Sequence, residues 1–120
     1  MMKKIMLTMV AALGLSAAAS AAVVPASFPG GKAAQDEYIA KNLKYPERAK
    51  ENGIEGVVGV VFVVNPDGSV GNIKIKRMVD PDLESEAIRL VKSMPKWQPA
   101  TDNGTPTEST AEVDVNFSLE

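Results

Sequence analysis

Hydrophobic and polar residues alternate in three stretches of the chain with the spacing of β-strands. Val57–Val64 is apolar on both faces, Ser69–Lys76 is apolar on one face, and Ala111–Leu119 alternates strictly. The first two stretches are joined by residues 65–68 (Asn-Pro-Asp-Gly), which favour a tight turn because glycine adopts the left-handed conformation that returns the chain. The pattern therefore predicts a β-hairpin, followed later in the chain by a third strand.

Helical spacing and helix-end signals predict three helices between and before these strands. The first covers Lys32–Lys44 and ends there because Pro46 excludes a helical residue before it. The second is short, Pro46–Asn52, with Gly53 as its cap. The third begins after Asp80, a good N-cap residue, and stops at proline 95. Its apolar stripe consists of Leu83, Ala87, Leu90, Val91 and Met94.

These elements predict an α+β fold with one three-stranded antiparallel or mixed sheet. The strand order is Ser69–Lys76, Val57–Val64, Ala111–Leu119, with the helices packed on one face of the sheet. The face toward the helices is predicted to carry Val58, Val60, Phe62, Val64, Ile73, Ile75, Val113, Val115, Phe117 and Leu119. The opposite face carries Val57, Val61, Val63, Lys74, Lys76, Asp114 and Asn116. Phe28 is expected to pack on the helix it precedes, and Trp97 to fill the core.

The first 21 residues have the three parts of a secretory signal: Lys3 and Lys4, an apolar stretch, and small residues ending in Ala19-Ser20-Ala21. The predicted organisation is a signal peptide at 1–21, a short lead at 22–27 with nothing to bury, and one domain at 28–120. The alternative is an uncleaved membrane anchor. Export by this route predicts a periplasmic protein, with no direct membrane anchoring after cleavage.

Composition narrows the possible functions of the exported part. Cleavage removes two of the 13 basic residues and none of the 15 acidic ones, so the formal charge falls from −2 to −4. A negative chain lacks the positive surface that nucleic acids require, so no nucleic-acid partner is predicted. The chain has no histidine and no cysteine, which removes the usual nucleophilic dyads and most zinc ligand sets. We predict no enzyme activity, no metal site and no cofactor.

The last predicted strand offers a surface for another chain. An edge strand presents unpaired N–H and C=O groups, and Ala111–Leu119 has no proline to block pairing. On this pattern alone, an ordinary domain edge and a site for strand addition by a partner peptide both remain open.

A series of motifs in a fixed order resembles the C-terminal domain of the TonB energy transducers. The series consists of Phe28-Pro29-Gly30-Gly31, Tyr45-Pro46, Gly53 to Val64, Pro66-Asp67-Gly68, Trp97-Gln98-Pro99 and the closing Val113 to Phe117. The resemblance implies a periplasmic domain that binds the TonB box, an extended N-terminal segment of outer-membrane TonB-dependent transporters, by strand addition beside the last strand. The implied partner-binding residues are Val113, Asp114, Val115, Asn116, Phe117, Ser118 and Leu119, together with Arg48 and Lys50 after the Tyr-Pro motif.

Two departures from that family qualify what the resemblance implies. Lys50 stands where well-known members carry glutamine, which affects the side-chain part of the contact and leaves the backbone part. Only residues 22–27 separate the signal from Phe28, whereas a full transducer has a retained membrane helix and a long spacer. We therefore expect a domain that binds a transporter without pulling on it. The alternative is a homotypic assembly module, a homodimer through Val57, Val61 and Val63 on the face away from the helices.

Overall fold

The computed structural model describes residues 22–119. The predicted signal peptide at 1–21 lies outside the described residues, so its cleavage stays a prediction. Among the helices of residues 22–119, none combines the length and the apolar character that crossing a membrane requires.

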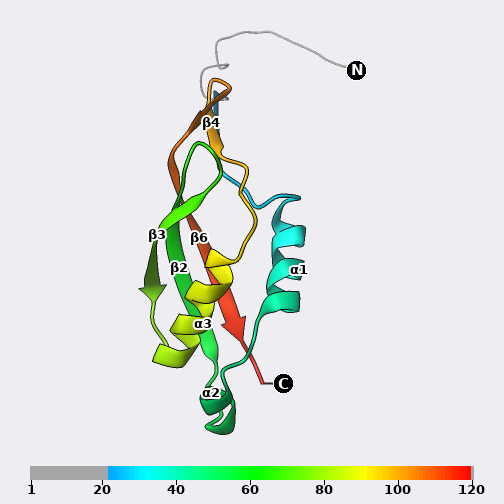
Figure 1. The fold of residues 1–120 in the computed structure, drawn as a ribbon, viewed down its shortest axis with the longest axis vertical. Helices are drawn as coiled ribbons and strands as arrows, with labels where there is room; N and C mark the ends of the chain where they lie inside the picture. The colour runs from blue at the N-terminus through cyan, green and yellow to red at the C-terminus, as the bar shows by residue number, and fades with distance from the viewer. Residues whose placement is uncertain (1–21, 120) are drawn as a thin grey trace.

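The central sheet has three antiparallel-paired strands in the predicted order. They are β3 (Val70–Arg77), β2 (Gly56–Val64) and β6 (Ser109–Phe117), with β2 in the middle. β3 and β6 both run antiparallel to β2, so they point the same way without touching (Figure 1). The predicted α+β class is confirmed, although β6 begins and ends two residues earlier than the alternation indicated.

The hairpin turn depends on one glycine in the left-handed conformation. Gly68 has φ +89°, its N–H donates to the Asn65 carbonyl at 2.8 Å, and its carbonyl accepts from the Trp97 N–H at 2.9 Å. A Cβ added at Gly68 would lie 2.4 Å from the Trp97 carbonyl oxygen. The turn is thus bound to the segment that follows the third helix, and a side chain at this position has no space.

We expect Gly68→Ala to lower the free energy of unfolding by more than about 2 kcal/mol. The left-handed conformation alone costs a non-glycine residue about 1–2 kcal/mol, and the contact with the Trp97 carbonyl adds to it. The matched control is Gly104→Ala, because Gly104 has φ +82° with no atom within 4 Å of an added Cβ. Urea denaturation of both variants measures the difference, and equal losses would contradict the steric argument.

Three helices accompany the sheet: α1 (Lys32–Asn42), α2 (Glu47–Glu51) and α3 (Pro81–Lys92). In Figure 1, α3 lies across the sheet and α1 stands on the side of β6. α3 begins as predicted, since an Asp80 carboxylate oxygen accepts from the N–H groups of Asp82 at 2.9 Å and Leu83 at 3.3 Å. Pro46 is the N-cap of α2, so this helix begins at Glu47, one residue later than the sequence suggested.

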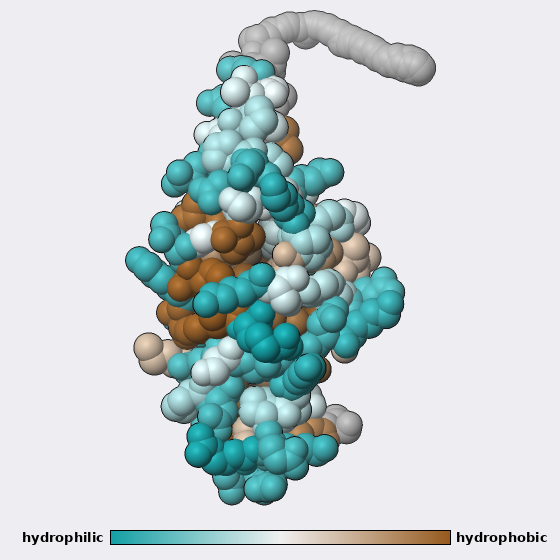
Figure 2. All heavy atoms as spheres, viewed as in Figure 1, coloured by the Kyte–Doolittle hydropathy of each residue, from teal (hydrophilic) through white to brown (hydrophobic). Residues whose placement is uncertain are grey.

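The core lies between α3 and the inner face of the sheet. Its fully buried members from the strands and α3 are Val58, Val60, Phe62, Val64, Leu83, Ala87, Leu90, Val91, Val113, Val115 and Phe117. Three residues predicted for this face are only half-buried: Ile73, Ile75 and Leu119. Figure 2 shows the resulting apolar surface over β3 beside α3.

Two aromatic residues outside the strands complete the core. Phe28 and Trp97 are both 5% exposed, and their ring centroids lie 6.0 Å apart, nearly perpendicular. Phe28 also packs on Tyr38 of α1 at 5.5 Å, and Trp97 packs on Phe62 of β2 at 5.2 Å. The predictions that Phe28 packs on the following helix and that Trp97 fills the core are confirmed.

A second, smaller sheet was missed by the sequence analysis. Its strands are β1 (Val23–Val24), β4 (Ala100–Asp102) and β5 (Thr105–Thr107), in the order β1-β4-β5. It forms the narrow upper end of the molecule in Figure 1. Strands of two or three residues are too short to show a periodicity, so the sequence predicted only a loop near residue 103.

Residues 22–27, predicted as a short lead with nothing to bury, contain no buried side chain, but their backbone is attached to the rest of the domain. Val23 and Val24 pair with Asp102 and Thr101. Ser27 exchanges backbone hydrogen bonds with Gln98 at 2.8 and 3.0 Å. Backbone pairing of this kind needs no apolar side chain, so hydrophobicity gave no signal for it.

Candidate functional site

The two edges of the central sheet differ in how well they could accept another strand. The β3 edge carries the exposed charges of Lys74, Lys76 and Arg77, and its pairing with β2 is interrupted by two register shifts. Asn72 in β3 has a positive φ of 49°. Irregular backbone and lysines are the features by which proteins protect an edge strand from pairing.

The β6 edge lacks this protection. β6 pairs with β2 over nine consecutive residues without a register shift and contains no proline. Its other side is unpaired among residues 22–119, because β1 pairs with β4 instead. Only Glu112 and Asp114 carry charge along the strand. β6 is therefore the edge of this sheet that can accept a further strand.

The hydrogen-bonding pattern of the hairpin identifies which residues of β6 face outward. The Asn65 N–H donates to the Ser69 carbonyl at 2.8 Å, so the backbone of Asn65 faces β3. Successive residues of a strand face opposite sides, so Val64 faces β6, where it pairs with Ser109. The alternation continues along the regular β2–β6 ladder. The residues that direct their N–H and C=O groups to the free edge are Thr110, Glu112, Asp114 and Asn116.

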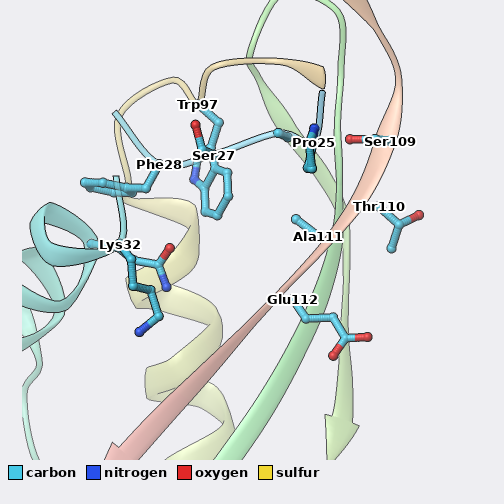
Figure 3. Close-up of a pocket in the computed structure, with 11 residues that line it drawn as sticks. Pro25, Ser27, Phe28, Lys32, Trp97, Ser109, Thr110, Ala111 and Glu112 are labelled. Carbon is cyan, nitrogen blue, oxygen red and sulfur yellow. The ribbon is translucent and has the colours of Figure 1, made fainter. Parts of the chain in front are cut away.

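A groove runs beside the first two-thirds of this edge. One part has a volume of about 380 Å³ and lies between residues 25–28, Lys32 and Trp97 on one side and residues 109–112 of β6 on the other (Figure 3). A second part of about 270 Å³ continues it, between Lys32 and Gln35 of α1 and residues 112–114. We call the two parts together the edge groove.

The structure places the predicted site residues of the last strand in four different situations. Val113 and Asp114 line the edge groove. Val115 and Phe117 are buried in the core, and Asn116 between them is exposed on the strand. The prediction that the strand continues through Ser118 and Leu119 is wrong. The Leu119 N–H donates to a Glu55 carboxylate oxygen at 3.0 Å instead, which ends the ladder.

The structure does not bring Arg48 and Lys50 into the edge groove. Both lie on α2, and Arg48 forms a two-bond ion pair with Asp82 at the start of α3, at 2.7 and 2.8 Å. Hydrogen bonding to Asp82 raises the pKa of Arg48, and the guanidinium holds the pKa of Asp82 below its ordinary value. The side chains of Arg48 and Lys50 are exposed on α2. A ligand strand paired with β6 would have to extend beyond the groove to contact them.

The Tyr-Pro motif has a structural role next to β6. The Tyr45 ring packs edge-on against Phe117 with centroids 5.6 Å apart, and its hydroxyl donates to the Ile54 carbonyl. Burial raises the pKa of Tyr45, and the charge of Glu55 adds to the effect. The motif therefore holds the C-terminal end of β6 against the residues just before the start of β2.

Sequence reasoning missed most of the residues that line the groove. These are the first four residues of β6, Ser109 to Glu112, together with Lys32 and Gln35 of α1 and residues 25–28. The predicted strand begins at Ala111, and Ser109 and Thr110 before it show no strong alternation. The contribution of α1 could not be found from spacing, because it depends on where the helix lies beside the sheet.

Fold and site together define a small α+β domain with a three-stranded antiparallel sheet, one protected edge and one open edge beside a groove. Within residues 22–119, no cluster of three acidic side chains is arranged to hold a metal ion. The chain belongs to the TonB C-terminal family: the family model described as Gram-negative bacterial TonB protein C-terminal matches residues 41–119. That family is one of energy-transduction proteins for transport, and not of enzymes.

Curated relatives and solved structures agree with this assignment. The chain is 38% and 41% identical to Protein TonB from two strains of Helicobacter pylori, over 65 and 56 residues. These matches cover 53% and 46% of this chain, and 23% and 20% of the relatives, so the chain corresponds to less than a quarter of their length. The match therefore does not assign the activity of the full-length relatives to this chain.

Two NMR solution structures of the H. pylori TonB C-terminal domain have the same fold. The shorter form gives a TM-score of 0.54 at 29% identity, covering 70% of this chain and 88% of that one. The longer form also gives 0.54, at 24% identity, covering 91% and 98%. The longer form supports the fold alone.

Proposed function

We propose that this chain is a periplasmic domain that binds an extended N-terminal segment of an outer-membrane TonB-dependent transporter by strand addition to β6. The observation that carries the proposal is the unpaired, regular edge of β6 beside the edge groove. Membership of the TonB family supplies the class of partner. Periplasmic location and the absence of a membrane anchor after cleavage remain predictions from the first 21 residues.

Backbone pairing sets the expected strength of this interaction. Each intramolecular hydrogen bond contributes only about 0.5–1.5 kcal/mol net, and association costs several kcal/mol of lost freedom. Four outward-facing residues can therefore support binding of about micromolar to millimolar affinity. Such binding is reversible, as expected of a transient contact between a periplasmic domain and a transporter.

The test is a titration of the ¹⁵N-labelled full chain with a synthetic peptide of a transporter's N-terminal segment from the same organism. We expect saturable shifts of the amide signals of Thr110, Glu112 and Asp114, because these N–H groups face the free edge. The control peptide has the same composition with proline at every second position. An absence of saturable shifts with any transporter peptide, or shifts confined to β3, would contradict the proposal.

The hypothesis of homotypic assembly remains a prediction. Val57, Val61 and Val63 lie on the outer face as expected, but all three are half-buried in the single chain. Asn72, Lys74 and Thr110 surround the hollow of about 260 Å³ beside Val61 and Val63, so polar groups interrupt the strip.

A further inference from the structure

One side chain on the wall of the edge groove has hydrogen-bonding capacity that the described fold does not use. Gln35 is in the first turns of α1, is only 9% exposed, and lines both parts of the groove. Its backbone N–H donates to the Gly31 carbonyl at 3.0 Å, but its side-chain amide forms no hydrogen bond with another residue of 22–119. A primary amide offers two donors and one acceptor, and those of Gln35 are open to the groove, where a ligand can reach them.

The other polar groups along the groove indicate what kind of ligand would use this amide. Trp97 Nε1 and Ser109 Oγ, unlike the amide of Gln35, are buried without a partner among the described residues. The cation of Lys32, in contrast, is already paired with Asp36 at 2.7 Å. The groups of the groove that remain unpaired are thus neutral, apart from the negative Asp114, which favours a polar ligand such as a peptide backbone over a free anion.

The position of Gln35 opposite β6 matches what an added strand lacks. A strand bound to β6 pairs through one of its edges, and its second edge points away from the sheet toward α1. Gln35 lines the groove across from residues 112–114. Its side-chain amide has the same donor and acceptor groups as a peptide unit, so it can pair with the N–H and C=O of that second edge.

We propose that Gln35 is a recognition residue that binds the outer edge of a peptide strand held in the edge groove. The inference rests on the proposed function, since it requires strand addition to β6. The peptide is held from both sides, by the backbone of β6 and by the amide of Gln35. The residue of the peptide that points to the floor is small and uncharged, because that floor consists of Phe28, Trp97 and Ala111.

The charges of the outer face add a second feature to the expected peptide. Glu112 and Asp114 direct their side chains to the face away from the helices, since Val113 between them is buried on the inner face. Glu112 is paired with Lys76 at 2.9 Å, whereas Asp114 has no ion pair within residues 22–119. Opposite charges across paired strands stabilise a sheet, so a basic or neutral peptide residue is expected opposite Asp114.

The experiment compares the wild-type chain with Gln35→Met, which keeps the length of the side chain and removes its amide. Both are titrated with the transporter peptide that binds the wild type, and the side-chain NH₂ signal of Gln35 is followed in the wild type. We expect affinity to fall about five- to tenfold, as for the loss of one or two hydrogen bonds, and the NH₂ signal to shift on binding. The matched control is Gln98→Met, because the Gln98 side chain is exposed and its backbone bonds to Ser27 are unaffected.

The outcomes separate the two proposals. Unchanged affinity of Gln35→Met, or a Gln35 NH₂ signal that does not move while β6 amides shift, overturns the role of Gln35 and leaves strand addition intact. No saturable binding to the wild type overturns strand addition and the role of Gln35 with it. If Gln35→Met fails to fold, the NH₂ signal of the wild type still decides.

Discussion

Replacing Asp114 by proline is expected to abolish detectable binding of the transporter peptide while leaving the domain folded. The backbone of Asp114 faces the free edge of β6, so proline removes an N–H that the ladder with β2 does not use. It also places the ring against the incoming strand. We expect at least a tenfold loss of affinity in the titration, because a central donor is lost and the neighbouring pairs are displaced.

Two controls make this result specific. Asp114→Ala keeps the backbone donor and removes the charge, so it is expected to bind within a few-fold of wild type. Val115→Pro is expected to unfold the sheet instead of only blocking the peptide. The backbone of Val115 faces β2 and its side chain is fully buried, so proline there disrupts the ladder inside the domain. Equal binding by Asp114→Pro and Asp114→Ala, with both folded, would show that the peptide does not pair with β6.

Replacing Trp97 by alanine is expected to lower the free energy of unfolding by about 3–5 kcal/mol, as for other large-to-small changes at buried aromatic residues. Trp97 is 5% exposed and lies between Phe28 and Phe62, with both rings nearly perpendicular to it. Total stabilities of small domains are about 5–15 kcal/mol, so this loss is a large fraction of the whole. Urea denaturation followed by circular dichroism measures it.

Trp97→Phe is the matched control for this prediction. Trp97 Nε1 has no partner among the described residues, so phenylalanine sacrifices no hydrogen bond and keeps a ring between Phe28 and Phe62. We expect it to lose less than half as much stability as Trp97→Ala. A loss below about 1 kcal/mol for Trp97→Ala would mean that the three rings do not form the stabilising cluster that their packing indicates.

The candidate site could be predicted only in part. The edge character of the last strand was visible in its position and its lack of proline, and Val113 and Asp114 do line the groove. The wall opposite them was not visible. Gln35 and Asp114 are far apart in sequence, and no spacing rule relates a residue in the first turn of a helix to a strand edge that forms later in the chain.

Arg48 shows what a family resemblance does not predict, which is the direction of a long side chain. The motif that carries it was identified correctly, and its neighbours Tyr45 and Pro46 do begin α2 beside the end of β6. The direction of the Arg48 side chain was decided by Asp82, a residue of another helix, through the ion pair at 2.7 Å. A motif fixes the backbone position of a residue, whereas the partner of a long charged side chain depends on which elements pack around it.

The sequence by itself determined the hairpin, α3 and the alternation of the last strand, because each depends on signals within a few neighbouring residues: Gly68 in the turn, Asp80 at the cap, and period two from Val113 onward. Only the tertiary structure decided the second sheet, the attachment of residues 22–27 and the groove between α1 and β6. These features are made by backbone pairing and packing between distant segments, which leave no hydrophobic period in the chain. The physical reason is that side-chain patterns record what each element buries, and not which open edge it leaves beside its neighbours.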